Sequence, residues 1–200
     1  MQYWNGTAWV MIPVGSNFTK LTLCDSVPTW ASGPCPGSSP YQIGETGPAG
    51  GIVFYITNDG LNGMEAALQD QGSAEWGCAG TAITGADGKA VGTGVQNTAD
   101  IVAGCNEPGI AAKIADDYTY NGYTDWFLPS NDELNLMWTN IGQGAPPPFT
   151  NVGGFANNIY WSSSESGDTS YVLIPNIYGG ATTIASKNTS AIRVRAIRAF

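Results

Sequence analysis

Three carboxylates and a serine stand among aromatic residues in the segment 122–138, GYTDWFLPSNDELNLMW. Such a cluster could carry acid/base chemistry, because a carboxyl group in an apolar setting can hold a proton near neutral pH. The spacing of Ser130 and Glu133, however, is that of a capping box, in which each residue bonds the backbone N–H of the other. Asp132 and Glu133 would then lie in the first turn, near the positive end of the helix dipole. We therefore expect these two acids to start a helix.

Asp125, next to Trp126, has no such role. It could be a general acid or a calcium ligand, or its carboxylate could bind a buried arginine or loop N–H groups. A lone carboxylate beside a core tryptophan is more often a satisfied buried group, so the structural interpretation is favoured.

An alternative function is a carboxylate-dependent glycan-active enzyme that uses two of Asp116, Asp117, Asp125 and Glu165. A retaining glycosidase needs two carboxyl groups about 5 Å apart. The chain has no histidine, which removes the usual general base, the Ser-His and Cys-His nucleophile pairs and the commonest zinc ligand. We expect a protein that is not an enzyme and has no catalytic residues.

Composition and charge narrow the class further. A chain of 200 residues that is 42% apolar, 12% charged and rich in glycine predicts one principal β-rich or α+β domain. The net charge of −9, with only seven basic residues, argues against nucleic acid and anionic membranes as partners. No run reaches the roughly 18 apolar residues of a membrane span, so we expect no membrane insertion.

The four cysteines are best explained as two disulfides, which we expect to join Cys24 with Cys35 and Cys78 with Cys105. Each pair brackets a compact, turn-rich segment. Buried free thiols in a reducing compartment are the alternative. The start of the chain shows no signal-peptide pattern. We therefore expect either a piece of a longer secreted polypeptide or a virion component.

Calcium is the cofactor to consider, because oxygen ligands on glycine-rich turns suit it. The candidate positions are Asn58, Asp59 and Asn62, and the surroundings of Asp87. Simple turn formation by these residues is the favoured alternative.

Periodicity predicts the elements that position these residues. Leu134, Met137, Trp138 and Ile141 form the apolar stripe of a helix that ends at Gly142. Shorter helices are expected at 98–104 and at 108–118, the latter with Pro108 in its first turn. The segment 51–57 has the apolar run of a central strand, with 64–68 as its partner.

Further strands are expected at 160–163, which contains Trp161, and at 171–174, 182–185 and 192–200. In the last, alternation places Arg193 and Arg195 opposite the apolar face but puts Arg198 inside. Either a bulge shifts the register or Arg198 is buried against a carboxylate. At the other end, residues 1 to about 30 predict two small strand pairs, with a two-residue turn at Asn5-Gly6, and a linker or stapled loop follows at 31–40.

Six segments resemble, in order, the C-terminal domain family of the Legionella collagen-like adhesin. They are residues 75–78, 97–105, 109–113, 121–134, 160–165 and 194–200, and the likeness covers about 41–200. The resemblance implies a C-type-lectin-like α+β domain with a twisted antiparallel sheet, two or three short helices and long disulfide-pinned loops. Residues 1–40 would be a β-hairpin segment of a fibre or an oligomerisation element. The resemblance further implies a homo-oligomer, often a trimer, that binds ligands at the end of a secreted surface protein. Since the chain is strongly acidic, the polyanionic ligands of the best-known member do not carry over.

The candidate ligand surface follows Trp161, where Tyr, Ser, Asn, Thr and Asp gather in loops, as they do in adaptable binding sites. These residues are Ser166, Asp168, Ser170, Tyr171, Asn176, Tyr178, Thr182 and Thr183. Every residue from 166 to 186 can be reached by changing adenines in asparagine codons, as expected of a target of a diversity-generating retroelement. An ordinary polar loop region is the alternative.

These observations favour an extracellular, cell-surface or virion recognition module that binds an unidentified glycan or protein ligand in adhesion or receptor binding. A purely structural subunit of a tail fibre or other fibre is the second possibility, and the glycan-active enzyme is the third.

Overall fold

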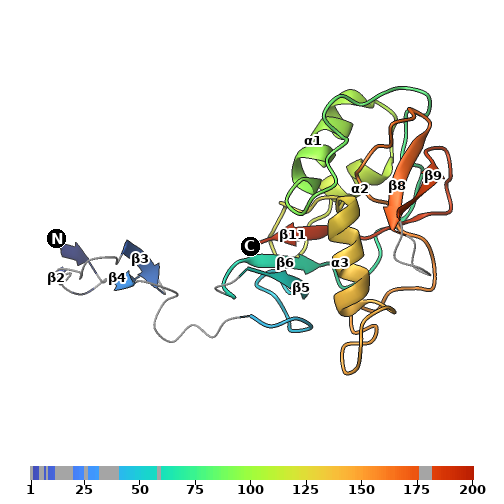
Figure 1. Ribbon diagram of the computed structural model, residues 1–200. Coiled ribbons are helices and arrows are strands. Elements are labelled where there is room, and N and C mark those ends of the chain that lie inside the picture. The colour runs from blue at the N-terminus through green and yellow to red at the C-terminus, as the bar shows by residue number, and fades with distance from the viewer. Residues whose placement is uncertain are drawn as a thin grey trace.

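The computed structural model describes residues 2–4, 7, 9–11, 20–24, 27–31, 41–57, 60–175 and 182–200. These residues form small antiparallel sheets and three helices, in agreement with the expected α+β class (Figure 1). The strands in chain order are β1 (Gln2–Trp4), β2 (Trp9–Met11), β3 (Lys20–Cys24), β4 (Val27–Ala31), β5 (Ile52–Ile56), β6 (Gly63–Ala66), β7 (Gly72–Ser73), β8 (Tyr171–Pro175), β9 (Thr182–Ser186), β10 (Arg193–Val194) and β11 (Ile197–Ala199). The helices are α1 (Gly94–Gly104), α2 (Ala111–Asp116) and α3 (Asn131–Ile141).

The two N-terminal strand pairs form as predicted, β1 with β2 and β3 with β4. Their first connection is longer than expected. Trp4 pairs with Trp9, so four residues, 5–8, separate the strands where Asn5-Gly6 alone predicted two. The expected linker lies almost entirely outside the described residues.

The largest sheet in the described residues has three strands in the order β11-β6-β5. The prediction for β5 was wrong in one respect, because β6 and not β5 lies in the middle of the strands described. The apolar character of β5 has another cause, since α3 packs on it. Glu65 of β6 is fully buried, and its carboxylate accepts from the N–H groups of Ala49 and Gly51. The central strand therefore carries a buried acid that alternation did not predict.

Helix α3 confirms the capping box. The Ser130 side chain accepts from the N–H of Glu133, and the Glu133 carboxylate accepts from the N–H of Ser130 at 2.7 Å. The same carboxylate also accepts from the N–H of Gly92 at 2.6 Å, so it ties the chain before α1 to the start of α3. Burial raises the pKa of Glu133, although these N–H groups favour its ionised form.

Replacing Ser130 with alanine should lower the free energy of unfolding by about 1–2 kcal/mol, as for other caps. The loss includes the bond from the Ser130 hydroxyl to the carbonyl of Ala90. Urea unfolding of the variant measures it. Thr139→Ala, at an exposed position in the same helix, is the control and should change stability by less than about 0.5 kcal/mol. Equal effects of the two substitutions would contradict the capping role.

The other two helices differ from their expected bounds. Helix α1 begins at Gly94, four residues earlier than predicted, and the hydroxyl of Thr98 bonds the carbonyl of Gly94 inside its first turn. Helix α2 begins only at Ala111, so Pro108 precedes it and does not occupy its first turn.

The C-terminal segment is not one strand. Its first part, β10, pairs with β7, and its second part, β11, pairs with β6. The ladder breaks at Arg195 and Ala196, which resets the alternation. Residues 160–163 are not a strand either, apart from a single bridge between Tyr160 and Arg193. There the hydroxyls of Ser162 and Ser163 bond the carbonyls of Leu173 and Pro129, and such bonds compete with a strand ladder.

The core contains the tryptophans Trp76, Trp126 and Trp161, all nearly or fully buried. The indole N–H of Trp161 donates to the carbonyl of Ala74, and that of Trp76 donates to the carbonyl of Ser162. Trp138 is only half-buried, on the surface of α3. No helix in the described residues is long and apolar enough to cross a bilayer.

Candidate functional site

The candidate ligand segment is built around the β8–β9 hairpin. The two strands pair from Tyr171 with Ser186 to Pro175 with Thr182. Figure 1 shows β8 between α3 and β9, so β9 lies on the outer side of the ribbon. Val172 and Ile174 point into the core, whereas Thr182, Thr183 and Ile184 are exposed.

The outer edge of β9 has backbone groups that find no partner among the residues that the structure describes. The N–H of Leu173 donates to the carbonyl of Ser164, on the side of β8 away from β9. Leu173 and its partner Ile184 therefore form a pair that exchanges no hydrogen bonds, and the N–H and C=O of Ile184 must point outward. Within the described residues these two groups bond to nothing else. The Ile184 side chain beside them is 53% exposed.

The turn that leads into β8 is held by its own polar side chains. The hydroxyl of Ser166 donates to the carbonyl of Asp168, and the carboxylate of Asp168 accepts from the N–H of Ser170. Tyr171 follows and is half-buried. Ser166 and Asp168 therefore shape the turn, and the Asp168 side chain is also exposed to solvent.

The structure gathers part of the predicted set on one hairpin. Ser166, Asp168, Ser170 and Tyr171 lie at one end of the hairpin, and Thr182 and Thr183 lie near the other. Asn176 and Tyr178 fall outside the described residues. The hydroxyl of Thr182 accepts a weak bond, 3.4 Å, from the amide of Asn131 at the start of α3.

A small apolar hollow of about 20 Å³ adjoins the end of β8. Its lining includes Trp138 of α3, Ile159 and Pro175 of β8. Ile159 is 43% exposed. The end of the hairpin where Pro175 pairs with Thr182 therefore lies beside an apolar hollow, which was not predicted from the sequence.

A buried ion pair joins the two ends of the candidate segment. The ammonium of Lys187 contacts the carboxylate of Glu165, with side chains only 0% and 7% exposed. Lys187 also donates to the carbonyl of Thr81 at 2.8 Å and lies 4.5 Å from the ring centre of Trp76. Glu165 accepts from the N–H of Ile83 at 3.0 Å. Residues 166–186 therefore extend from a fixed, water-excluded base.

The other acids considered for catalysis have separate partners. Asp116 and Asp117 both lie at the ammonium of Lys113, and Lys113 and both acids are substantially exposed. Asp125 accepts from the guanidinium of Arg198 at 2.6 Å, as its structural interpretation predicted, but its own side chain is 58% exposed and not buried. The four carboxylates are thus divided among three cations, Lys113, Arg198 and Lys187.

Both alternatives raised for Arg198 apply, a shift in the strand register and burial against a carboxylate. The strand break shifts the register, and the Arg198 side chain is only 11% exposed, with its guanidinium paired to Asp125 and Glu65. Its carbon also lies 4.1 Å from the ring centre of Tyr123. The neighbouring acids raise the pKa of Arg198 against the opposing effect of desolvation, which is the largest single cause.

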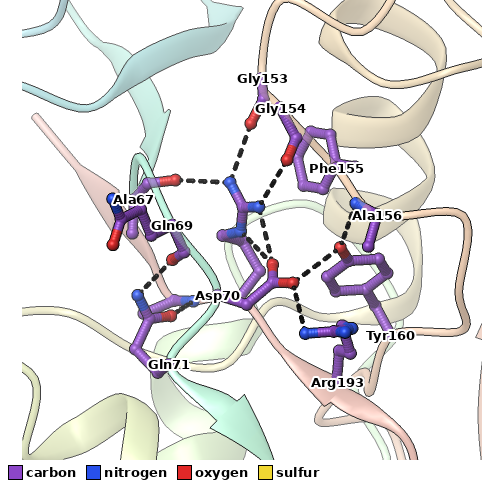
Figure 2. A network of polar contacts seen from close by, with 12 residues as sticks. Ala67, Gln69, Asp70, Gln71, Gly153, Gly154, Phe155, Ala156, Tyr160 and Arg193 are labelled. Atoms are coloured by element: carbon purple, nitrogen blue, oxygen red, sulfur yellow. Dashed lines mark hydrogen bonds and ion pairs between the residues drawn. The ribbon is translucent and has the colours of Figure 1, made fainter.

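A second buried network surrounds Asp70 and was not predicted (Figure 2). Arg195, expected on the outer face, is 1% exposed, and its guanidinium lies 2.7 Å from Asp70. Arg195 also donates to the carbonyls of Ala67 and Gly153. The guanidinium of Arg193 and the hydroxyl of Tyr160 also donate hydrogen bonds to the Asp70 carboxylate. Burial, followed by the charge of Asp70, raises the pKa of Tyr160.

The predicted disulfide between Cys78 and Cys105 is present. The side chain of Cys24 and the whole of Cys35 fall outside the described residues, so their pairing stays a prediction. The same holds for calcium at Asn58 and Asp59. Asn62 and Asp87 are exposed.

Comparison with known proteins adds no relative: no protein-family model matches the chain, and neither does any curated protein.

Proposed function

We propose that residues 41–200 form a non-catalytic ligand-recognition module of the C-type-lectin-like kind, acting in adhesion or receptor binding. The observation that carries this proposal is the ion pair of Glu165 and Lys187, which closes the base of segment 166–186 inside the core. A recognition segment needs a base that stays fixed while its exposed residues vary. A buried pair at its two ends supplies that base.

The exposed part of the segment suits binding. Thr182, Thr183 and Ile184 offer hydroxyls, apolar surface and a strand edge without a partner among the described residues in one short stretch. An edge of this kind can bond a polypeptide backbone, and the hydroxyls can bond a glycan. Both ligand classes remain within the proposal, which places the module on an extracellular, cell-surface or virion fibre and in a homo-oligomer joined through residues 1–40.

The net charge of −9 favours a neutral or basic ligand. Five of the seven basic residues are held in ion pairs: Lys113, Lys187, Arg193, Arg195 and Arg198. The acids outnumber them, so the surface potential is negative and repels polyanions. A sulfated or phosphorylated polymer is therefore a poor candidate.

Replacing Thr182, Thr183 and Ile184 together with alanine should weaken ligand binding at least tenfold and leave the melting temperature within about 2 °C, because these side chains are exposed. Binding of the full chain to glycan arrays and to whole cells measures the first, and thermal unfolding the second. Val95→Ala, at an exposed apolar position on α1, is the matched control.

Binding that survives the triple substitution would contradict the assignment of the ligand surface. Absence of any bound ligand, with the chain assembling into fibres, would favour the structural alternative. Glycan turnover that is lost in Glu165→Gln would instead favour the enzyme.

A further inference from the structure

The disulfide of Cys78 and Cys105 lies beside a carboxylate. Both Sγ atoms and one carboxylate oxygen of Glu107 lie within 4.8 Å of one another. The N–H of Cys78 donates to Glu107 at 2.8 Å and holds the acid there. No other group of three such side chains comes this close in the part of the chain that the structure describes.

We propose that reduction of this disulfide creates a site for zinc or a similar thiophilic divalent cation, with Cys78, Cys105 and Glu107 as ligands. A dithiol reductant breaks the S–S bond, gives each sulfur a hydrogen and is itself oxidised to a disulfide. The cation then displaces the two thiol protons and binds two thiolates and the carboxylate. In the oxidised chain the sulfurs are bonded to each other and cannot act as thiolate ligands.

The distances suit such a site. Zn–S bonds of about 2.3 Å and Zn–O bonds of about 2.0 Å in a tetrahedron place the ligand atoms about 3.5–3.8 Å apart. The three ligand atoms already lie within 4.8 Å of one another, so movements of only about 1–2 Å would bring them to these separations. Two thiolates and one carboxylate also form a ligand set that zinc accepts and calcium or magnesium does not prefer.

The surroundings favour a cation and leave room for a fourth ligand. Cys105 directly follows α1, so the site lies at the carbonyl end of that helix, where positive charge is stabilised. A hollow of about 230 Å³ is lined in part by Cys105, Glu107 and Lys113, which leaves space for a water molecule. The charge of Lys113 is offset by Asp116 and Asp117.

The cation would then do in a reducing compartment what the disulfide does in an oxidising one. Both hold Cys78 to Cys105 and so close the long loop that leads into α1. This inference is independent of the proposed ligand surface on β8–β9, and it can fail while that proposal stands.

The test uses the full chain carrying Cys24→Ser and Cys35→Ser, so that only Cys78 and Cys105 contribute thiols. The protein is reduced, freed of reductant without air, and titrated with Co²⁺, whose bonds to thiolate give a charge-transfer absorption band. We expect one Co²⁺ per chain, displaced by Zn²⁺, and no band in the oxidised protein. Glu107→Gln should weaken Co²⁺ binding at least tenfold, whereas the control Glu75→Gln should change it less than twofold.

Thermal unfolding shows whether the reduced chain is still folded and whether the cation stabilises it. Zn²⁺ should raise the melting temperature of the reduced chain and leave that of Cys78→Ser/Cys105→Ser unchanged. Absence of the band in the reduced chain, folded or unfolded, would overturn the proposal. So would equal Co²⁺ affinities of the Glu107→Gln and Glu75→Gln variants.

Discussion

Lys187→Met is expected to lower the free energy of unfolding by about 3–5 kcal/mol, the range found when one partner of a buried ion pair is removed. The substitution leaves the carboxylate of Glu165 buried, with the N–H of Ile83 as its remaining hydrogen-bond donor among the described residues. It also leaves the carbonyl of Thr81 without its donor and removes the cation beside Trp76. Methionine is unbranched like lysine and only one heavy atom shorter, so little of the loss should come from an empty cavity.

Denaturant unfolding of the variant measures the loss, and Lys113→Met is its matched control. Lys113 makes the same kind of pair with Asp117 at the surface, where such pairs contribute only about 0–1 kcal/mol. The double variant Glu165→Leu/Lys187→Met should recover much of the stability, because it leaves no unpaired charge. A loss below about 1 kcal/mol in Lys187→Met would contradict the view that this pair fixes the base of the segment.

The stability of this pair bears on the proposed recognition function. If Glu165 and Lys187 hold the two ends of the segment, then substitutions at exposed positions between them should alter binding with little effect on folding. Substitutions at Glu165 or Lys187 should instead lower the free energy of unfolding. Variants along 166–187 therefore separate residues that bind from residues that support.

The parts of the fold that could be predicted are those determined by neighbours in sequence. Ser130 and Glu133 are three residues apart, and Leu134, Met137 and Ile141 repeat with the period of a helix, so α3 was predicted with its cap. Strands β8 and β9 followed from short β-forming runs between turn residues. In each case the interacting residues lie within one or two turns of each other or within one hairpin.

The partners in the buried ion pairs could not be identified from the sequence, because they are far apart in it. For Arg198 a carboxylate partner was raised as an alternative, but not that it would be Glu65. The separation is 125 residues for Asp70 and Arg195 and 133 for Glu65 and Arg198. Strict alternation placed Arg195 on the surface. That rule failed because β10 and β11 pair with different strands, and the break between them turns Arg195 inward.

The candidate site was predicted only in part for the same reason. Its exposed threonines were identified by residue type, but Lys187 carried no local signal. Glu165 was considered only as a catalytic acid. Nothing nearby in sequence indicates that these residues meet across the base of the hairpin.

The network around Asp70 leads to the second large effect. Asp70→Asn should lower the free energy of unfolding by about 3–5 kcal/mol, because the buried charge of Arg195 loses its counter-charge. Asparagine keeps the size of the side chain. Its single amide oxygen, however, can accept hydrogen bonds from only some of the donors on Arg195, Arg193 and Tyr160. The carbonyls of Ala67 and Gly153 still accept from Arg195, yet they carry no full charge.

Denaturant unfolding measures the loss. The control is Asp87→Asn, at an exposed position, which should change the free energy of unfolding by less than about 0.5 kcal/mol. Combining Asp70→Asn with Arg195→Met should cost less than the sum of the single losses, because the two residues lie in one network. Additive losses would mean that Arg195 is stabilised mainly by the backbone carbonyls around it. In that case the carbonyls of Ala67 and Gly153, and not Asp70, would be what holds Arg195 in the core.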